Sequence, residues 1–241
     1  MLLNPKLFSY LCGMKFGVVI FPGSNCDQDL IDVLSGYSSE AVEKLWHKSS
    51  DLKGCTHIFI PGGFSYGDYL RSGAIAKLSP IMDAVSQHAA NGGFVMGICN
   101  GFQILTESGL LPGALLRNTN IKFNCKNVFL TPGTTNSMVT NKLSENQVIQ
   151  VPIAHGEGRF YCDQETLAQI EANNQVIFRY CDSEGNLTDE SNPNGSINNI
   201  AGITNAGRNV FGMMPHPERC AAEYLLNADG SLVFESLGVS V

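Results

Sequence analysis

The sequence contains little charge and no basic cluster, which removes several classes of protein from consideration. Charged residues make up 15% of its 241 residues, and the formal net charge is −7. Nucleic-acid binders neutralise phosphates with clustered lysine and arginine, so we expect no nucleic-acid partner. Low charge leaves part of the surface neutral or apolar, which favours a frequent or permanent protein partner.

Long apolar runs are also missing. None approaches the roughly 20 residues that a helix needs to span a bilayer, so we expect no membrane partner. Residues 1–13 hold an apolar patch, but its flanks are not those of a secretory signal. Because Met14 directly precedes the first strand-like run, we interpret residues 1–13 as an N-terminal extension and residues 14–241 as a single domain.

Cysteine spacing argues against the common metal and disulfide frameworks. Eight cysteines are spread along the chain without a C-x-x-C pair. Zinc and iron–sulfur sites use closer spacing, and disulfide frameworks belong to shorter secreted chains. We therefore expect no metal, mostly reduced thiols and a cytoplasmic protein. The phosphate-binding pattern G-x-x-x-x-G-K-[ST] is missing too, which predicts no ATP site on this chain.

Short apolar runs alternate with helix-compatible segments in the first half of the chain. This alternation predicts an α/β fold with a doubly wound, mostly parallel sheet flanked by helices. Asn25 is a candidate N-cap for the first helix. The second half predicts short strands and little helix. The expected strands are residues 15–21, 57–60, 93–98, 128–130, 148–152, 176–181, 200–204 and 210–214, and the expected helices are 26–34, 80–91 and 102–108.

A glycine-flanked cysteine, in Gly97-Ile98-Cys99-Asn100-Gly101, is the most informative feature of the chain. It ends an apolar run and opens a helix-compatible segment, as in the cysteine form of a nucleophile elbow. Small neighbours avoid clashes around the strained turn, and the helix N-terminus favours a thiolate at Cys99. An inert buried cysteine is the alternative for Cys99 taken alone.

A base for this nucleophile occurs late in the chain, in Pro215-His216-Pro217-Glu218. Residues two apart in an extended segment share a face, so the Glu218 carboxylate can orient the His216 imidazole. Cys99, His216 and Glu218 are therefore the candidate nucleophile, base and orienter. A rigid loop with a surface histidine is the alternative for His216 alone.

Further candidates surround the expected site, because ligands bind outside the carboxyl ends of the strands in such a sheet. The backbone N–H groups of Gly63 and Asn100 are the candidate oxyanion hole, although a glycine-rich loop can also be a simple turn. Gln103 lies one helical turn past the cysteine and could face either the ligand or solvent. Residues 155–159 form either a ligand-facing loop or a structural turn.

The chain resembles the class I (triad) glutamine amidotransferases, a family whose fold is a flavodoxin-like three-layer arrangement. The resemblance runs from Met14 nearly to the C-terminus. Asparagine follows the cysteine where many members carry leucine, and this variant points to the purine-pathway branch. The matching stretches are residues 21–27 (FPGSNCD), 61–71 (PGGFSYGDYLR), 97–103 (GICNGFQ), 154–160 (AHGEGRF) and 214–219 (MPHPER).

This resemblance implies a glutaminase that hydrolyses L-glutamine through a glutamyl thioester on Cys99. It implies that the ammonia goes to a separate synthetase subunit, which uses ATP and Mg²⁺ to act on formylglycinamide ribonucleotide. A small third subunit bridges the two in many organisms of this branch. The resemblance also places Gln103 among the groups that contact glutamine. It further implies that this chain itself binds no cofactor.

Two other classes of protein stay open. Proteases and chaperone-like stress proteins share the cysteine elbow and the sheet, but they generally lack a His-Pro-Glu placed this late. A non-enzymatic regulatory subunit has no need of Cys99 and His216 together. Reaction of Cys99 with a glutamine-like diazoketone would separate a glutaminase from both.

Overall fold

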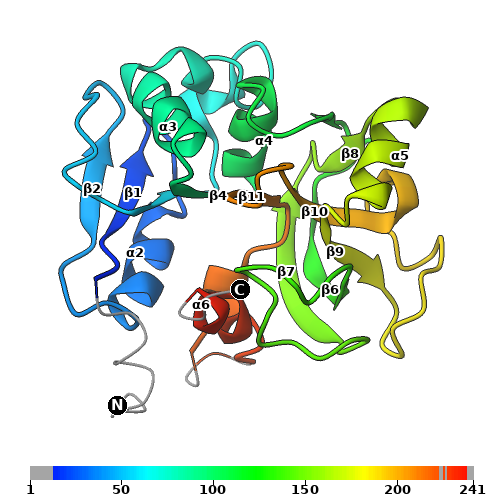
Figure 1. The fold of residues 1–241 in the computed structure, drawn as a ribbon. Coiled ribbons are helices and arrows are strands. Elements are labelled where there is room, and N and C mark those ends of the chain that lie inside the picture. The colour runs from blue at the N-terminus through cyan, green and yellow to red at the C-terminus, as the bar shows by residue number, and fades with distance from the viewer. Residues whose placement is uncertain (1–12, 223–224, 226, 238–241) are drawn as a thin grey trace.

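A nine-stranded sheet forms the centre of the molecule (Figure 1). The structure is a computed structural model, and it describes residues 13–222, 225 and 227–237. In spatial order the strands are β2 (Glu43–Trp46), β1 (Phe16–Ile20), β3 (His57–Ile60), β4 (Phe94–Ile98), β11 (Val210–Met213), β10 (Ile200–Thr204), β9 (Val176–Cys181), β6 (Asn124–Pro132) and β7 (Ile149–His155).

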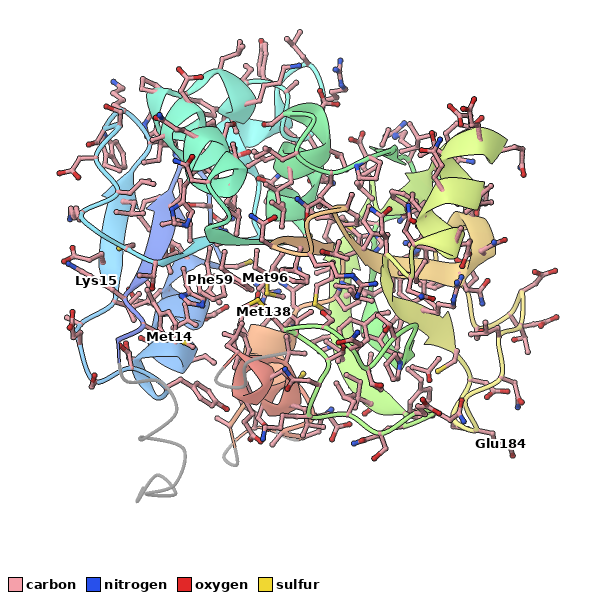
Figure 2. The ribbon with its side chains drawn as sticks, viewed as in Figure 1. Met14, Lys15, Phe59, Met96, Met138 and Glu184 are labelled. Atoms are coloured by element: carbon pink, nitrogen blue, oxygen red, sulfur yellow. The ribbon has the colours of Figure 1, made fainter. Side chains whose placement is uncertain are left out.

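The side of the sheet from β2 to β11 is parallel. Every residue of β3 and β4 is buried, as expected for parallel strands covered on both faces. Figure 2 shows Phe59 and Met96 in the interior, whereas Glu184 lies at the periphery. Because parallel strands end at one edge, the segments that follow β3, β4 and β11 meet there.

Antiparallel strands extend the sheet on the other side, from β11 through β10, β9 and β6 to β7. Alternate residues of β7 are buried, so one face of this strand packs on the core. A separate antiparallel pair joins β5 (Ala114–Leu116) to β8 (Arg159–Tyr161). The predicted α/β class with a helix-flanked, doubly wound sheet is confirmed, with these antiparallel strands added at one side.

Helices cover both faces of the parallel strands. In Figure 1, α3 (Pro80–Ala90) and α4 (Asn100–Glu107) lie on one face, and α2 (Asp27–Ser35) lies on the other. Pro80 starts α3, where its missing N–H costs nothing, as predicted. The remaining helical segments are η1 (Ser65–Asp68), η2 (Ala76–Leu78), α5 (Gln164–Ala172), η3 (Ile197–Asn199), η4 (Pro217–Cys220) and α6 (Ser231–Ser236).

The expected N-cap of the first helix is wrong. Cys26, not Asn25, is the residue before α2, and it makes no capping hydrogen bond through its side chain. Ser24 holds the preceding turn instead, because its hydroxyl donates to the Phe21 carbonyl at 2.8 Å and to Asp27 Oδ2 at 3.3 Å. This local side-chain bond places the start of α2 one residue later than the sequence pattern suggested.

Residues 1–12 lie outside the described residues, so the N-terminal extension and the single domain stay predictions. No helix within the described ranges is long and apolar enough to cross a membrane. The seven cysteines that the structure describes are not joined in disulfides.

Candidate active site

Cys99 occupies a strained turn between β4 and α4. Its backbone lies at φ 51° and ψ −104°, outside the regions that non-glycine residues favour. A Cβ on Gly97 would meet the backbone of Gly101, and a Cβ on Gly101 would overlap the carbonyl oxygen of Ile60. The Cys99 N–H donates to the Met213 carbonyl at 2.8 Å, which ties the turn to β11. The turn has the geometry of the nucleophile elbow expected from the sequence.

His216 and Glu218 form a buried pair directly after β11. His216 Nδ1 lies 2.6 Å from Glu218 Oε1, and the two side chains are 2% and 1% exposed. The His216 N–H donates to the Pro152 carbonyl, which joins this segment to β7. A Cβ on Gly62 would lie 2.6 Å from His216 Cε1 and 3.3 Å from Cys99 Cβ. Glycine therefore lets the imidazole and the nucleophile approach the same loop.

The surroundings of His216 favour a charged imidazole. Burial by itself lowers the pKa of His216, but the Glu218 carboxylate and negative charge at Cys99 outweigh it and hold this pKa well above the usual value. An imidazolium beside a cysteine sulfur is the arrangement that supports a thiolate nucleophile. Within the described part of the chain no well-formed hydrogen bond occupies His216 Nε2, and the ring lies beside the Cys26 and Cys99 side chains, so Nε2 is available for proton transfer.

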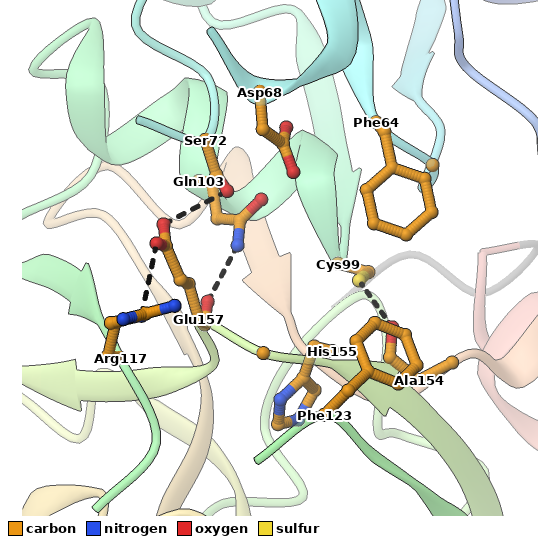
Figure 3. A pocket seen from close by; sticks show the side chains of 12 residues that line it. Phe64, Asp68, Ser72, Cys99, Gln103, Arg117, Phe123, Ala154, His155 and Glu157 are labelled. Atoms are coloured by element: carbon orange, nitrogen blue, oxygen red, sulfur yellow. Dashed lines mark hydrogen bonds and ion pairs between the residues drawn. The ribbon is translucent and has the colours of Figure 1, made fainter. Parts of the chain in front are cut away.

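A pocket of about 190 Å³ opens over Cys99 (Figure 3). Cys99 is only 4% exposed, and its thiol donates to the Ala154 carbonyl at 3.8 Å. The pocket thus joins the loop after β3, the elbow after β4 and the end of β7. Besides Cys99 its walls include Gly63, Asp68, Gln103, Arg117, Phe123 and Glu157.

Gly63 and Asn100, the candidate oxyanion residues, both lie beside Cys99. Gly63 lines the pocket at φ 124°, a conformation that favours glycine. Asn100 is the first residue of α4, so its N–H belongs to the turn without intrahelical partners. Asn100 Oδ1 also accepts from the Ser65 N–H at 3.1 Å, which ties the glycine loop to α4. The oxyanion role of the two N–H groups stays a prediction.

Gln103 faces the pocket and not solvent, since it is 5% exposed. Its Nε2 donates to the Glu157 carbonyl at 2.6 Å, and its Oε1 accepts from Asn100 Nδ2 at 2.8 Å. The side chain therefore joins α4 to the turn after β7 and fixes one wall of the pocket. Contact between Gln103 and substrate stays a prediction.

Two carboxylates also border the pocket: Asp68, which the sequence did not single out, and Glu157, which lies in the segment that the sequence left open between a ligand-facing loop and a turn. Burial raises the pKa of the Asp68 carboxyl, in spite of hydrogen bonds from Ser72 and Asn100 that lower it. Glu157 accepts from Ser72 Oγ at 3.1 Å and lies 4.0 Å from Arg117 Nε. The sequence did contain a signal for these two acids, because both lie inside stretches that resemble the family.

His155, whose role the sequence left open, also borders the pocket. It is 3% exposed, and neither ring nitrogen has a hydrogen-bond partner among the residues described. Burial, with a contribution from the charge on His216, lowers the pKa of His155 to about 4. The ring packs where a Cβ on Gly158 would lie. His155 is therefore a neutral group at physiological pH.

Comparison with known proteins agrees with this geometry. Residues 14–231 match the family described as the CobB/CobQ-like glutamine amidotransferase domain. Phosphoribosylformylglycinamidine synthase subunit PurQ of Koribacter versatilis is 57% identical over 224 residues, which cover 93% of this chain and 97% of that protein. The same subunit of Moorella thermoacetica is 54% identical over 93% of this chain and 95% of its own length. The structure of PurLQS from Thermotoga maritima matches with TM-score 0.79 and 41% identity, over 93% of this chain and 97% of the matched chain.

The fold is therefore that of an enzyme subunit of the glutamine amidotransferase class. Within that class, the chain belongs to the family of phosphoribosylformylglycinamidine synthase subunit PurQ.

Proposed function

We propose that the chain is the glutaminase subunit of phosphoribosylformylglycinamidine synthase and releases ammonia from L-glutamine at Cys99. The observation that carries this function is the packing of Cys99 and the buried His216–Glu218 pair around Gly62, with Cys99 also lining a small pocket. The identity to PurQ proteins over almost the whole chain supports the same conclusion.

The reaction begins with attack of the Cys99 sulfur on the side-chain amide carbon of glutamine. The tetrahedral oxyanion accepts hydrogen bonds from the N–H groups of Gly63 and Asn100, each worth about 2.7–4 kcal/mol by analogy with other oxyanion holes. The C–N bond then breaks, which leaves a glutamyl thioester on Cys99 and releases the amide nitrogen.

His216 moves the protons in both halves of the reaction. Its imidazolium donates a proton from Nε2 to the leaving nitrogen, so that ammonia departs, and the neutral ring then takes a proton from the attacking water. Glu218 fixes the ring orientation through Nδ1 and stabilises its cation. Hydrolysis of the thioester releases glutamate and returns Cys99 to its starting state.

Charged groups around the pocket match the α-substituents of a free amino acid. Asp68 and Glu157 supply negative charge for the α-ammonium group, and Arg117 supplies positive charge for the α-carboxylate. A glutamine so held extends its side-chain amide toward Cys99 at the other side of the pocket. The substrate is therefore free L-glutamine, since a peptide would lack both α-charges.

The ammonia serves a separate synthetase subunit, which holds ATP and Mg²⁺ and converts formylglycinamide ribonucleotide to formylglycinamidine ribonucleotide. A small third subunit bridges the two, and the assembled enzyme works in the cytoplasm in purine biosynthesis. The match to PurLQS supports such an assembly. Apolar side chains exposed on the loops around the pocket form a suitable docking face: Phe64, Tyr69, Leu70, Ile121 and Phe123.

The decisive experiment measures glutamate release by this chain alone and then with the synthetase subunit, ATP and formylglycinamide ribonucleotide. We expect slow release alone and strong stimulation by the complete mixture, because ammonia set free without an acceptor wastes glutamine. Fast glutamate release that does not change when the synthetase subunit is added would refute the assignment of this chain to purine biosynthesis. No release under any condition would refute the glutaminase itself.

Substitution of Asp68 tests how glutamine is recognised. Asp68→Asn should raise KM for glutamine about 10–100-fold with less change in kcat, since a hydrogen bond to a charged group is worth roughly 1.5–3 kcal/mol. Because burial raises the pKa of Asp68, KM of the wild-type enzyme should also rise on mild acidification, and Asp68→Asn should lose that dependence. Asp83→Asn, at an exposed position on α3, is the control. Equal KM values in both variants would contradict this role.

A further inference from the structure

A second thiol lies beside the catalytic imidazole. Cys26, directly before α2, is 3% exposed. Its Sγ, a ring nitrogen of His216 and a carboxylate oxygen of Glu218 all lie within 4.8 Å of one another. A Cβ on Gly62 would lie 3.2 Å from Cys26 Sγ and 2.6 Å from His216 Cε1, so the thiol and the ring pack against the same glycine. No step of the proposed reaction uses this thiol.

Two polar atoms of the cluster are buried without a hydrogen-bond partner in the described ranges, His216 Nε2 and Glu218 Oε2. An unpaired buried polar group costs about 1–3 kcal/mol, so each such atom calls for an explanation. A role in proton transfer explains why His216 Nε2 is unpaired. It does not account for Glu218 Oε2, because Glu218 uses only Oε1 to hold the ring.

We propose that Cys26, His216 and Glu218 bind a thiophilic divalent cation, with Zn²⁺ as the representative, and that this cation inhibits the glutaminase. Thiolate, imidazole and carboxylate are the three ligand types that zinc takes in proteins. The sulfur separates zinc from Mg²⁺ and Ca²⁺, which require oxygen ligands. Zinc–ligand bonds of roughly 2.0–2.3 Å require the three groups to close by roughly an ångström.

The surroundings of Cys26 hold its sulfur in place. Arg219 Nη2 donates to Cys26 Sγ at 3.0 Å, and Arg219 Nε donates to Asp29 Oδ2 at 3.3 Å. A bound cation either shares the Cys26 sulfur with the Arg219 guanidinium or displaces that guanidinium toward Asp29. Entry is through the pocket over Cys99, where the carboxylates of Asp68 and Glu157 attract a cation.

Cation binding at these residues stops the chemistry for a direct reason. A cation on His216 Nε2 takes the atom that exchanges protons. A cation on Nδ1 and the Glu218 carboxylate instead breaks the contact that orients the ring. The inhibitory consequence rests on the proposed function, whereas binding of the cation does not.

The test uses the full chain carrying Cys99→Ala, which removes the nucleophile as a competing ligand. Co²⁺, a spectroscopic substitute for Zn²⁺, is added, and the sulfur-to-cobalt charge-transfer absorption is recorded. Zn²⁺ affinity is then measured by competition with a chromophoric chelator. Further variants on this background are Cys26→Ala and the near-isosteric Cys26→Ser, with Cys125→Ser, at an exposed cysteine, as the matched control. Thermal melting verifies that each variant is folded.

We expect one cation per chain with a sulfur-to-cobalt band in the Cys99→Ala and Cys125→Ser proteins. Loss of Cys26 should remove the band and weaken Zn²⁺ binding by more than about 100-fold. Loss of a residue that only supports a ligand weakens metal binding by up to about 100-fold, so loss of a direct ligand should weaken it further. In chains that keep Cys99, Zn²⁺ should inhibit glutamate release far less when Cys26→Ser is present.

Absence of the band, or its survival without Cys26, would overturn the proposal. Equal inhibition with and without Cys26 would also overturn it, because Cys99 and His216 alone would then bind the metal. The metal-binding readouts need no turnover, so their failure is distinct from a lack of glutamate release by the metal-free enzyme.

Discussion

Cys99→Ala should abolish glutamine-dependent synthesis by the assembled enzyme while synthesis from added ammonia continues. Removal of a catalytic nucleophile costs on the order of 10⁶-fold in turnover in a comparable triad, which takes glutamate release below detection. The ammonia reaction persists because its chemistry belongs to the synthetase subunit. Alanine keeps the Cβ at the strained φ of 51°, so the elbow itself is unchanged. Glutamate release and nucleotide product are measured in parallel.

Cys125→Ser is the matched control, because this cysteine is exposed and is not one of the residues that line the pocket. It should leave both glutamine-dependent and ammonia-dependent synthesis unchanged. Glutamate release that persists in purified Cys99→Ala would mean that another group attacks the amide. Loss of ammonia-dependent synthesis as well would show that the substitution damages the assembly and not the chemistry.

Glu218→Gln should lower glutamine-dependent kcat by on the order of 10⁴-fold, the size of the equivalent change in a Ser-His-Asp triad. The amide retains the volume of the carboxylate but removes the negative charge that holds the pKa of His216 high. The imidazolium that protonates the leaving nitrogen therefore becomes scarce. Steady-state kinetics with glutamine measure the loss, and Glu190→Gln, at an exposed residue of a loop, is the control.

The same substitution should change the pH dependence of stability. The native pKa of His216 is raised, so the native state binds the proton more tightly than the unfolded chain does. The resulting stabilisation is complete below the unfolded pKa of about 6.5 and is lost as pH rises through the native pKa. Denaturant titrations should therefore show the largest difference between wild type and Glu218→Gln below about pH 6.5. A pH-independent difference would contradict the charge pairing.

Sequence patterns anticipated the parts of the site that follow from strand ends. Cys99 and His216 lie far apart along the chain, yet both follow strands of the parallel side, and β4 and β11 are neighbours in the sheet. Runs of buried aliphatic residues predict such strands well because both faces are covered. The Cys99–His216–Glu218 arrangement could therefore be predicted before any coordinates.

Other elements gave weaker signals. Edge strand β2 buries only Leu45, so no apolar run indicated it. Helix α5 buries only Leu167 and Ile170, and its best signal was the cap, where the Asp163 side chain accepts from the Thr166 N–H. Contacts between side chains distant in sequence, such as Cys26 against His216, depend on packing, and spacing along the chain carries no information about them.

The β4–β11 ladder has a consequence for how the protein is made. Gly97 pairs with Gly212, so strands roughly 115 residues apart in the sequence bring the nucleophile to its base. On the ribosome the N-terminal segments emerge and begin to fold first. In the proposed mechanism the nucleophile is thus synthesised long before its base. If His216 is the base, we expect a nascent chain to hydrolyse glutamine only after nearly all of it has been translated, which would confine ammonia release to nearly complete molecules.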